Sequence, residues 1–249
     1  MLSLVLPTYN EAGNIRQVVK QIQGILQDVP HEIIVVDDDS PDGTWRIVEE
    51  MSASDPSVRV LRRVGRRGLS SAAIEGFRTA KGDVLAVADA DGQHDYALLP
   101  RLYERVRMHG GIAVGSRYVE GGSVGAWDER RRLLSRIATW LALRLCRVKV
   151  RDPMSGFFAV SRATFDRVAP GLRPRGFKIL FDILIAVPKE TPAAEVPYVF
   201  RTRGVGESKL SLRVELAFLF SLFEATLRRF ALPLVVLCCL VLLMLFFLV

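Results

Sequence analysis

The sequence contains few cysteines, only three among its 249 residues. Cys238 and Cys239 are adjacent inside an apolar stretch and Cys146 stands far from both, so their spacing does not fit a disulfide framework. A basic leader before the first apolar run, residues 2–6, is also lacking, which favours a first strand over a signal peptide. We therefore expect a reduced domain that faces the cytosol.

Internal repeats and low-complexity linkers are absent as well. A chain of 249 residues, half of them hydrophobic, is long enough for one large α/β domain and too short for two such domains with linkers. Positive charge, by contrast, is in excess, with a formal net charge of +7. Such a charge indicates an anionic partner, which can be a nucleic acid, a phospholipid surface or a phosphorylated substrate.

Charged residues are missing from residues 230–249. About 20 helical residues, at about 1.5 Å each, cross a hydrocarbon core of about 30 Å, so this stretch is predicted to be a transmembrane helix; a buried core helix is the alternative. Arg228 and Arg229 stand immediately before it, and basic residues favour the cytoplasmic side of a span. We therefore expect a membrane protein with a single C-terminal span and its large N-terminal domain on the cytoplasmic face.

Short aliphatic runs alternate with stretches of helical character along the first half of the chain. The runs are residues 2–6, 32–36, 58–62, 84–88 and 112–115. The helical stretches are residues 14–27, 44–54, 71–80 and 97–108. This alternation predicts an α/β domain in which helices cover both faces of a mostly parallel sheet. Ligands of such sheets bind at the carboxyl ends of the strands, where the polar clusters of this sequence fall.

Two amphipathic stretches predict helices that lie on a membrane surface. The first stretch is residues 130–150, which are rich in arginine and for which a core helix is the alternative. Its apolar face holds Leu133, Ile137, Trp140 and Leu141. Residues 211–229 form a cleaner stripe of leucine and phenylalanine, and we expect this second stretch to lead into the span.

The apolar run at residues 84–88 leads into Asp89, Asp91 and Gln93. Oxygen ligands at this spacing suit Mg²⁺ or Mn²⁺, which in turn hold a diphosphate. Gly92 permits the turn that lets these side chains converge on one ion. Taken alone, the cluster favours a solvated turn, and the neighbouring motifs reverse this preference.

Polar residues also follow the first two predicted strands. Asp37 and Asp39 are placed to accept hydrogen bonds from ribose hydroxyls, whereas turn-and-cap roles are favoured for Asp38 and Asp42. The cluster after the first strand could surround a base and its sugar, or begin a helix, and periodicity does not decide between these interpretations. Its candidate residues are Pro7, Tyr9 and Glu11.

Eight ordered motifs lie within residues 2–210. They are Leu6-Pro-Thr-Tyr-Asn-Glu11, Val36-Asp-Asp-Asp-Ser-Pro-Asp-Gly-Thr44, Gly68-Leu-Ser-Ser-Ala72, Asp89-Ala-Asp91, Gly115-Ser-Arg-Tyr118, Asp152-Pro-Met-Ser-Gly-Phe157, Gly176-Phe-Lys-Ile179 and Arg203-Gly-Val-Gly-Glu-Ser-Lys-Leu210. In this order they resemble the inverting glycosyltransferases of family 2, and within that family the dolichol- or polyprenol-phosphate mannose synthases. The resemblance implies a Rossmann-like catalytic domain of the GT-A type over residues 1–210, followed by an interface helix at 211–229 and a span at 230–249.

For the donor, the resemblance implies a sugar nucleotide, GDP-mannose, with UDP-glucose as the alternative. The residues it assigns to the nucleotide sugar are Pro7, Tyr9, Glu11, Asp37, Asp39, Asp89, Ala90, Asp91 and Asp152. Asp89, Asp91 and Gln93 then match a metal triplet that bridges the donor diphosphate through Mg²⁺ or Mn²⁺. Such a cation stabilises the charge that the leaving nucleoside diphosphate gains.

For the acceptor, the resemblance implies a dolichyl or polyprenyl phosphate. The residues it assigns to the acceptor phosphate are Arg117, Arg131, Arg203 and Lys209, and those it assigns to catalysis are Asp91, Arg117 and Lys178. An ionised phosphate oxygen attacks without a strong general base, so a catalytic histidine is not required. We expect His31 and His109 to be solvated, and His94 is a weaker candidate for contact with the metal or phosphate.

Some features depart from this pattern or suggest other functions. Ser70 and Ser71, together with the Gly92–Gln93 pair, differ from many mannose synthases, which weakens the assignment of the sugar more than that of the reaction. A processive polysaccharide synthase is disfavoured because the chain lacks a Gln-x-x-Arg-Trp motif. An anchored module that binds lipids or nucleotides without turnover is the alternative from another class. Nucleic-acid binding ranks lowest, and association into a dimer or tetramer has no sequence marker.

Overall fold

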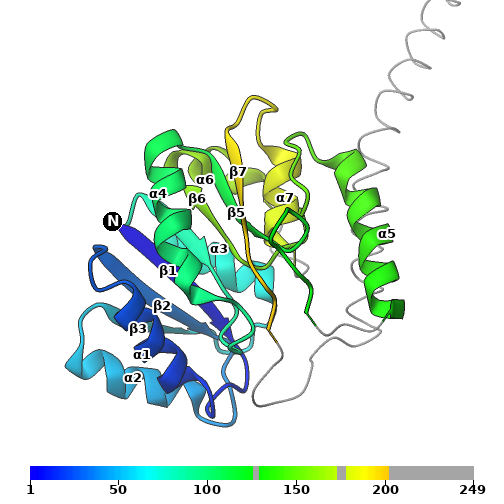
Figure 1. Cartoon of the computed structure of the whole chain (residues 1–249). Helices are drawn as coiled ribbons and strands as arrows, with labels where there is room; N and C mark the ends of the chain where they lie inside the picture. The colour runs from blue at the N-terminus through cyan, green and yellow to red at the C-terminus, as the bar shows by residue number, and fades with distance from the viewer. Residues whose placement is uncertain (126–128, 173–177, 202–249) are drawn as a thin grey trace, which may run out of the picture. The chain divides into compact units, whose positions relative to one another are not determined.

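The computed structural model describes residues 1–125, 129–172 and 178–201. This part of the chain contains a seven-stranded sheet (Figure 1). Its strands are β1 (Leu2–Thr8), β2 (His31–Asp37), β3 (Val58–Arg62), β4 (Val84–Val87), β5 (Ile112–Ser116), β6 (Phe158–Ser161) and β7 (Ala193–Pro197). They are ordered β3-β2-β1-β4-β6-β5-β7, and only β6 runs antiparallel to its neighbours within this described sheet. The predicted mostly parallel sheet is confirmed.

Helices cover the sheet on both faces (Figure 1). They are α1 (Ile15–Ile25), α2 (Thr44–Ser54), α3 (Leu69–Thr79), the 3₁₀ turn η1 (Tyr96–Leu98), α4 (Leu99–His109), α5 (Glu129–Leu145), α6 (Arg162–Val168), the 3₁₀ turn η2 (Ala169–Gly171) and α7 (Ile179–Ala186). The four helices predicted from the first half of the sequence are therefore present, within a few residues of their expected bounds.

Successive side chains of β1 point to opposite faces of the sheet, as strand geometry requires. Leu4 and Leu6 belong to the buried cluster formed with α1, α2 and α4. Val5 lies on the other face, against α3, where a Cβ built on Gly76 would stand 2.5 Å from Val5 Cγ1. Glycine at this position therefore allows α3 to pack directly on the sheet.

Strands β6 and β7 were not predicted. β6 and β7 have only four and five residues, and β6 pairs with β4 through Val87 and Phe158, which are far apart in the chain. Both segments are defined by pairing with strands that are distant in the chain. The chain therefore inserts β6 between β4 and β5, an arrangement that alternation of strands and helices did not indicate.

Helix α5 ends at Leu145, five residues before the end of the stretch predicted to be amphipathic. Lys149 Nζ donates to the carbonyl oxygens of Leu143 and Cys146 and so satisfies groups at this helix end. Trp140 is 55% exposed, whereas Leu145 is buried. The helix therefore has one face against the domain and an aromatic residue on its outer face.

The predicted interface helix at 211–229 and the predicted span at 230–249 lie outside the described residues. Within residues 1–125, 129–172 and 178–201, no helix combines the length and the apolar character needed to cross a membrane.

Candidate metal and nucleotide site

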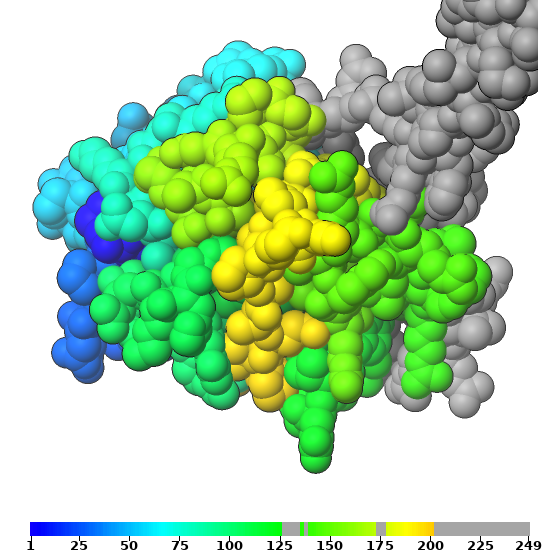
Figure 2. All heavy atoms as spheres, turned by 90° about the horizontal axis from the view of Figure 1, so that it is seen from above, coloured from blue at the N-terminus to red at the C-terminus, as the bar shows by residue number. Residues whose placement is uncertain are grey.

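The carboxyl ends of β1, β2, β4 and β5 meet at one edge of the sheet, at the bottom of Figure 1. Thr8, at the end of β1, pairs in register with Asp37, at the end of β2. Because β6 is antiparallel, the segment that precedes Phe158 reaches this same edge beside β4. Figure 2 shows the opposite edge of the domain, where α4 and α6 lie near the N-terminus. The candidate residues in the described ranges gather at the first edge.

The acidic cluster forms a turn immediately after β4. Gly92 adopts a positive φ of 74°, and Asp91 Oδ1 accepts a hydrogen bond from the Gln93 backbone N–H at 3.0 Å. The Asp89 side chain is 35% exposed, whereas Asp91 is 7% exposed and Ala90 is buried. The predicted turn at Gly92 is confirmed.

The side chains of this turn fit a hard divalent cation in part. Asp89 and Asp91 supply carboxylate oxygens, and the Gln93 amide nitrogen donates to the Arg201 carbonyl at 3.1 Å, so a metal ligand from Gln93 would be its amide oxygen. Within the described residues, no three His, Cys, Asp or Glu side chains converge as an ion-binding group. An ion here would therefore need the Gln93 oxygen or donor phosphate oxygens beside the two carboxylates.

His94 is buried behind this turn rather than facing the solvent, with 2% of its surface exposed. The Asp89 backbone N–H donates to His94 Nδ1 at 3.1 Å, and His94 Nε2 lies 3.6 Å from Asp89 Oδ2. Burial lowers the pKa of His94, and the nearby carboxylates of Asp89 and Asp91 oppose this shift without overcoming it. The neutral ring therefore supports the turn from within the core.

Asp37, expected to contact a ribose, is fully buried at the end of β2. Its carboxylate accepts hydrogen bonds from Thr8 Oγ1 at 2.8 Å, from Ser40 N at 2.8 Å and from Ser40 Oγ at 2.6 Å. These contacts fix the turn that presents Asp39. Asp39 has a φ of 56°, its side chain is 34% exposed, and it forms an ion pair with Arg62 at 2.6 Å.

The turn role predicted for Asp42 is confirmed. Its carboxylate accepts from the backbone N–H of Thr44, the first residue of α2, at 3.0 Å and from Ala12 N at 3.0 Å. Asp38 joins β2 to the loop after β3 instead, because its carboxylate accepts from Gly68 N at 2.8 Å and lies 3.1 Å from Arg63 Nε. Burial raises the pKa of Asp38, and these two contacts offset only part of that shift.

Around the first strand, Tyr9 is half-buried and Glu11 is buried, while Pro7 forms part of β1. Arg67 was not among the candidates. Its guanidinium lies 4.3 Å from the centre of the Tyr9 ring and donates to the Tyr9 hydroxyl at 2.7 Å. The glycines that flank it in Gly65-Arg-Arg-Gly68 were the available signal, because they mark a loop at the carboxyl end of β3.

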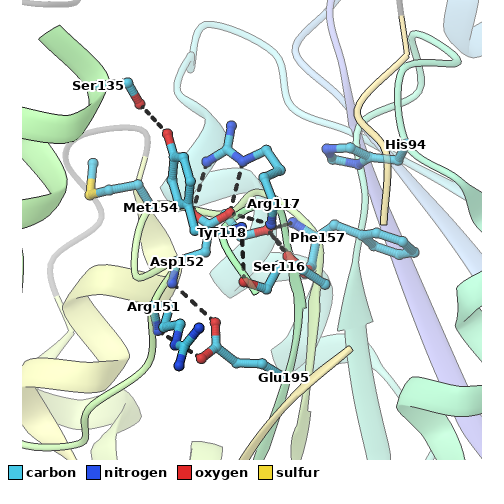
Figure 3. A network of polar contacts seen from close by, with 12 residues as sticks. His94, Ser116, Arg117, Tyr118, Ser135, Arg151, Asp152, Met154, Phe157 and Glu195 are labelled. Carbon is cyan, nitrogen blue, oxygen red and sulfur yellow. Dashed lines mark hydrogen bonds and ion pairs between the residues drawn. The ribbon is translucent and has the colours of Figure 1, made fainter. Parts of the chain in front are cut away.

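Arg117 and Asp152, assigned separately to acceptor and donor, form one buried ion pair (Figure 3). Asp152 accepts from Arg117 N at 3.0 Å, from Nε at 2.8 Å and from Nη2 at 2.9 Å. Burial opposes the charge on Arg117, but the Asp152 carboxylate outweighs it and raises the pKa of Arg117. The fork geometry fixes the orientation of the guanidinium.

A second carboxylate, not predicted as a site residue, supports this pair from β7. Glu195 accepts from Arg151 N at 2.7 Å and from Asp152 N at 3.1 Å (Figure 3). On the other side, the Tyr118 hydroxyl lies 2.8 Å from Ser135 Oγ of α5. The network therefore extends from β7 through the ion pair at the end of β5 toward α5.

Lys178, a predicted catalytic residue, stands at the start of α7 and donates to the Met154 carbonyl at 3.1 Å. This contact places it beside the same 152–157 segment that carries Asp152. The side chain of Arg131, and Arg203 and Lys209 altogether, lie outside the described residues. Their assignment to the acceptor phosphate stays a prediction.

Comparisons with known proteins agree on the family. The dolichol-phosphate mannosyltransferase of Pyrococcus furiosus is 46% identical over 212 residues, which cover 84% of this chain and 59% of that protein. The chain thus spans less than two thirds of this relative. The dolichol-phosphate mannosyltransferase of Saccharomyces cerevisiae is 35% identical, covering 92% of this chain and 88% of that protein. The polyprenol monophosphomannose synthase of Mycolicibacterium smegmatis is also 35% identical, over 84% of this chain and 80% of that protein.

Two solved structures share the fold at low sequence identity. Glucosyl-3-phosphoglycerate synthase from Mycobacterium tuberculosis, in complex with Mn²⁺, UDP and glucosyl-3-phosphoglycerate, has a TM-score of 0.63 and 22% identity over 92% of this chain and 79% of that one. The mannosyltransferase PcManGT from Pyrobaculum calidifontis, in complex with GDP-Man and Mn²⁺, has a TM-score of 0.54 and 20% identity over 80% of this chain and 55% of that one. The expected GT-A-like α/β fold is confirmed. Because the model of Glycosyl transferase family 2 also matches residues 3–169, the chain belongs to that family.

Proposed function

We propose that the protein transfers one mannosyl residue from GDP-mannose to a dolichyl or polyprenyl phosphate with inversion. The assignment of the reaction follows relatives named as mannosyltransferases or mannose synthases of dolichol, polyprenol and undecaprenyl phosphate. The single structural observation that carries it is the Asp89–Gln93 turn at the end of β4, beside the ends of β1 and β2 and the Arg117–Asp152 pair. A donor and an acceptor phosphate can therefore meet at one edge of the sheet.

In this proposal Tyr9 and Asp39 contact the nucleoside, while the buried Asp37 acts through the turn that it fixes. Asp89, Asp91 and Gln93 would hold Mg²⁺ or Mn²⁺, which supplies electrostatic stabilisation of the departing nucleoside diphosphate. The protein's own contribution is to orient these oxygens before the donor binds, since Asp91 is already fixed by the Gln93 backbone N–H.

The acceptor phosphate attacks the anomeric carbon as the bond between that carbon and the diphosphate oxygen breaks. An ionised phosphate oxygen needs no base to remove a proton. Because Asp152 neutralises Arg117, we propose that Arg117 contributes mainly orientation, whereas Arg131, Arg203 and Lys209 contribute net positive charge. Lys178 would stand beside the sugar through its contact with the 152–157 segment.

We further propose that the enzyme acts at the cytoplasmic face of the cell membrane, anchored by residues 230–249. An acceptor with a polyprenyl chain has its phosphate at the bilayer surface, so a basic domain held there meets the substrate directly. The exposed Trp140 of α5 is compatible with this location, because tryptophan is enriched at membrane interfaces. Self-association is not required by this mechanism.

The experiment is transfer of radiolabelled sugar from GDP-mannose, and in parallel UDP-glucose, into an organic-extractable polyprenyl phosphate, with Mn²⁺ or a chelator. We expect lipid-phase label from GDP-mannose that disappears with chelator and with Asp91→Ala. Asp83→Ala is the matched control, because Asp83 is 87% exposed and lies before β4, at the opposite end of that strand.

Label from UDP-glucose alone would replace mannose with glucose and retain the reaction class. No lipid label from either donor, with folded protein that binds nucleotide, would overturn the proposed transfer. Lipid adhesion that responds to salt and not to chelator would then favour the anchored binding module.

A further inference from the structure

His94 contacts Asp89 through both of its ring nitrogens. Nδ1 accepts the Asp89 backbone N–H at 3.1 Å, and Nε2 lies 3.6 Å from Asp89 Oδ2. Since a backbone N–H can only donate, Nδ1 carries no hydrogen and the neutral ring has its hydrogen on Nε2. The Asp89 side chain, which lies beside this edge of the ring, is 35% exposed.

The Asp89 peptide is also held at its carbonyl. The Tyr96 hydroxyl donates to the Asp89 carbonyl oxygen at 2.6 Å. One residue of the chain is therefore clamped at its N–H by His94 and at its C=O by Tyr96. Gly156 lies against the same place, since a Cβ built there would stand 3.4 Å from Asp89 Oδ2 and 3.5 Å from His94 Cε1.

An aromatic cage packs around the imidazole. The ring stacks on Phe157 at 5.0 Å with an interplanar angle of 9°. Tyr198 and Phe200 meet it edge-on at 5.9 Å and 5.8 Å. The cage thus joins the segment before β6 and the segment after β7, and it supports the ring in the orientation in which Nδ1 accepts from Asp89.

We infer that His94 is a positioning residue that fixes Asp89 for binding the divalent cation. The inference rests on the metal site of the proposed function, and it differs from a role as metal ligand, because the ring is buried behind Asp89. Groups that orient a ligand from behind commonly contribute a factor of about 10 to 100 in metal affinity. Without the ring, Asp89 loses its contacts with Nδ1 and Nε2, while Tyr96 still holds its carbonyl oxygen.

The test measures Mn²⁺ binding by the full-length protein in detergent, from the free Mn²⁺ signal in electron paramagnetic resonance, with and without GDP. We expect His94→Phe, which keeps an aromatic ring and removes both nitrogens, to raise the Kd for Mn²⁺ by about 10- to 100-fold. His94→Asn can restore an acceptor near Nδ1, and we expect it to recover part of the affinity. Phe165→Leu is the matched control, because Phe165 is buried against Phe77 in another part of the core.

The outcomes separate the positioning role of His94 from the proposed metal site. If the wild type binds Mn²⁺ and His94→Phe binds it with the same Kd, the positioning role is wrong and the metal site stands. The melting temperatures of both variants are measured as well. If Phe165→Leu lowers the melting temperature as much as His94→Phe does and weakens Mn²⁺ binding equally, the effect is general destabilisation and the inference is overturned. If the wild type binds no Mn²⁺ in either condition, the proposed metal site fails, and the inference fails with it.

Discussion

Two buried arginine–aspartate pairs lie at the same edge of the sheet, and they are built differently. Arg117 makes three hydrogen bonds to Asp152, all between 2.8 and 3.0 Å. Arg63, only 1% exposed, lies 3.1 Å from Asp38 Oδ1 without the geometry of a hydrogen bond. Its charge also faces a second carboxylate, Glu75, at 3.7 Å.

The two pairs balance a buried charge in different ways. The Arg117 charge depends on one carboxylate, and the pair is favourable enough to raise the pKa of Arg117 despite burial. At the other pair, burial dominates and raises the pKa of Asp38. Arg63 therefore joins several segments through shared contacts, whereas the guanidinium of Arg117 is oriented by three hydrogen bonds to Asp152 beside the proposed acceptor site.

The largest effect is expected from Asp152→Asn, which leaves Arg117 buried without its counter-charge. Removing one member of a buried pair costs about 3–5 kcal/mol, so the free energy of unfolding should fall by that amount. Denaturant titration of the full-length protein in detergent measures it. Asp83→Asn, at an exposed position, should stay within about 0.5 kcal/mol of the wild type.

A double variant, Arg117→Met with Asp152→Leu, tests whether the uncompensated charge of Arg117 causes the loss of stability. Replacing both members of a buried ion pair by apolar residues is often neutral for stability, so most of the lost stability should return. Sugar transfer should remain abolished, because the oriented guanidinium is gone. A double variant as unstable as Asp152→Asn would contradict the uncompensated charge as the cause.

A smaller effect is expected from Glu195→Gln, which weakens the support behind Asp152. The amide oxygen can accept from Arg151 N or from Asp152 N, and losing the other hydrogen bond costs about 1 kcal/mol. If Asp152 then shifts, the KM for polyprenyl phosphate should rise by about fivefold while kcat changes little. Steady-state kinetics measures both, and an unchanged KM would separate Glu195 from the orientation of Arg117.

Asp38→Asn should cost less than about 1 kcal/mol of unfolding free energy at neutral pH. The raised pKa means that the fold already disfavours the ionised carboxylate, and the amide oxygen can still accept from Gly68 N. Glu75 remains beside Arg63 to balance its charge. The same denaturant titration tests this, and a loss as large as that of Asp152→Asn would erase the contrast between the two pairs.

The smallest expected effect is on the pH dependence of stability. Because the folded pKa of Asp38 lies above its ordinary value of 3.8, the folded state binds more protons than the unfolded state between these two values. Stability from this group is therefore present below pH 3.8 and is lost as the pH rises through the folded pKa. Unfolding free energies across this window should show that component in the wild type and not in Asp38→Asn.

Much of the fold was predictable from local pattern. Aliphatic runs punctuated by polar turns located β1 to β5, and the helix between β2 and β3 was predicted with its observed bounds, Thr44–Ser54. The turn at Gly92 was also expected, because glycine there admits a positive φ. Strands β6 and β7 were missed because their stability comes from neighbours that are distant in the chain.

By itself, the sequence determined the alternation of strands and helices, the family and the chemical types of the candidate site residues. These follow from local spacing, since each polar cluster directly follows its own strand. Only the tertiary structure decided that Arg117 pairs with Asp152, that Glu195 supports that pair and that His94 lies behind Asp89. Such contacts depend on the order of strands in the sheet, and in particular on the antiparallel β6, which brings residues 152–157 to the carboxyl ends of β4 and β5.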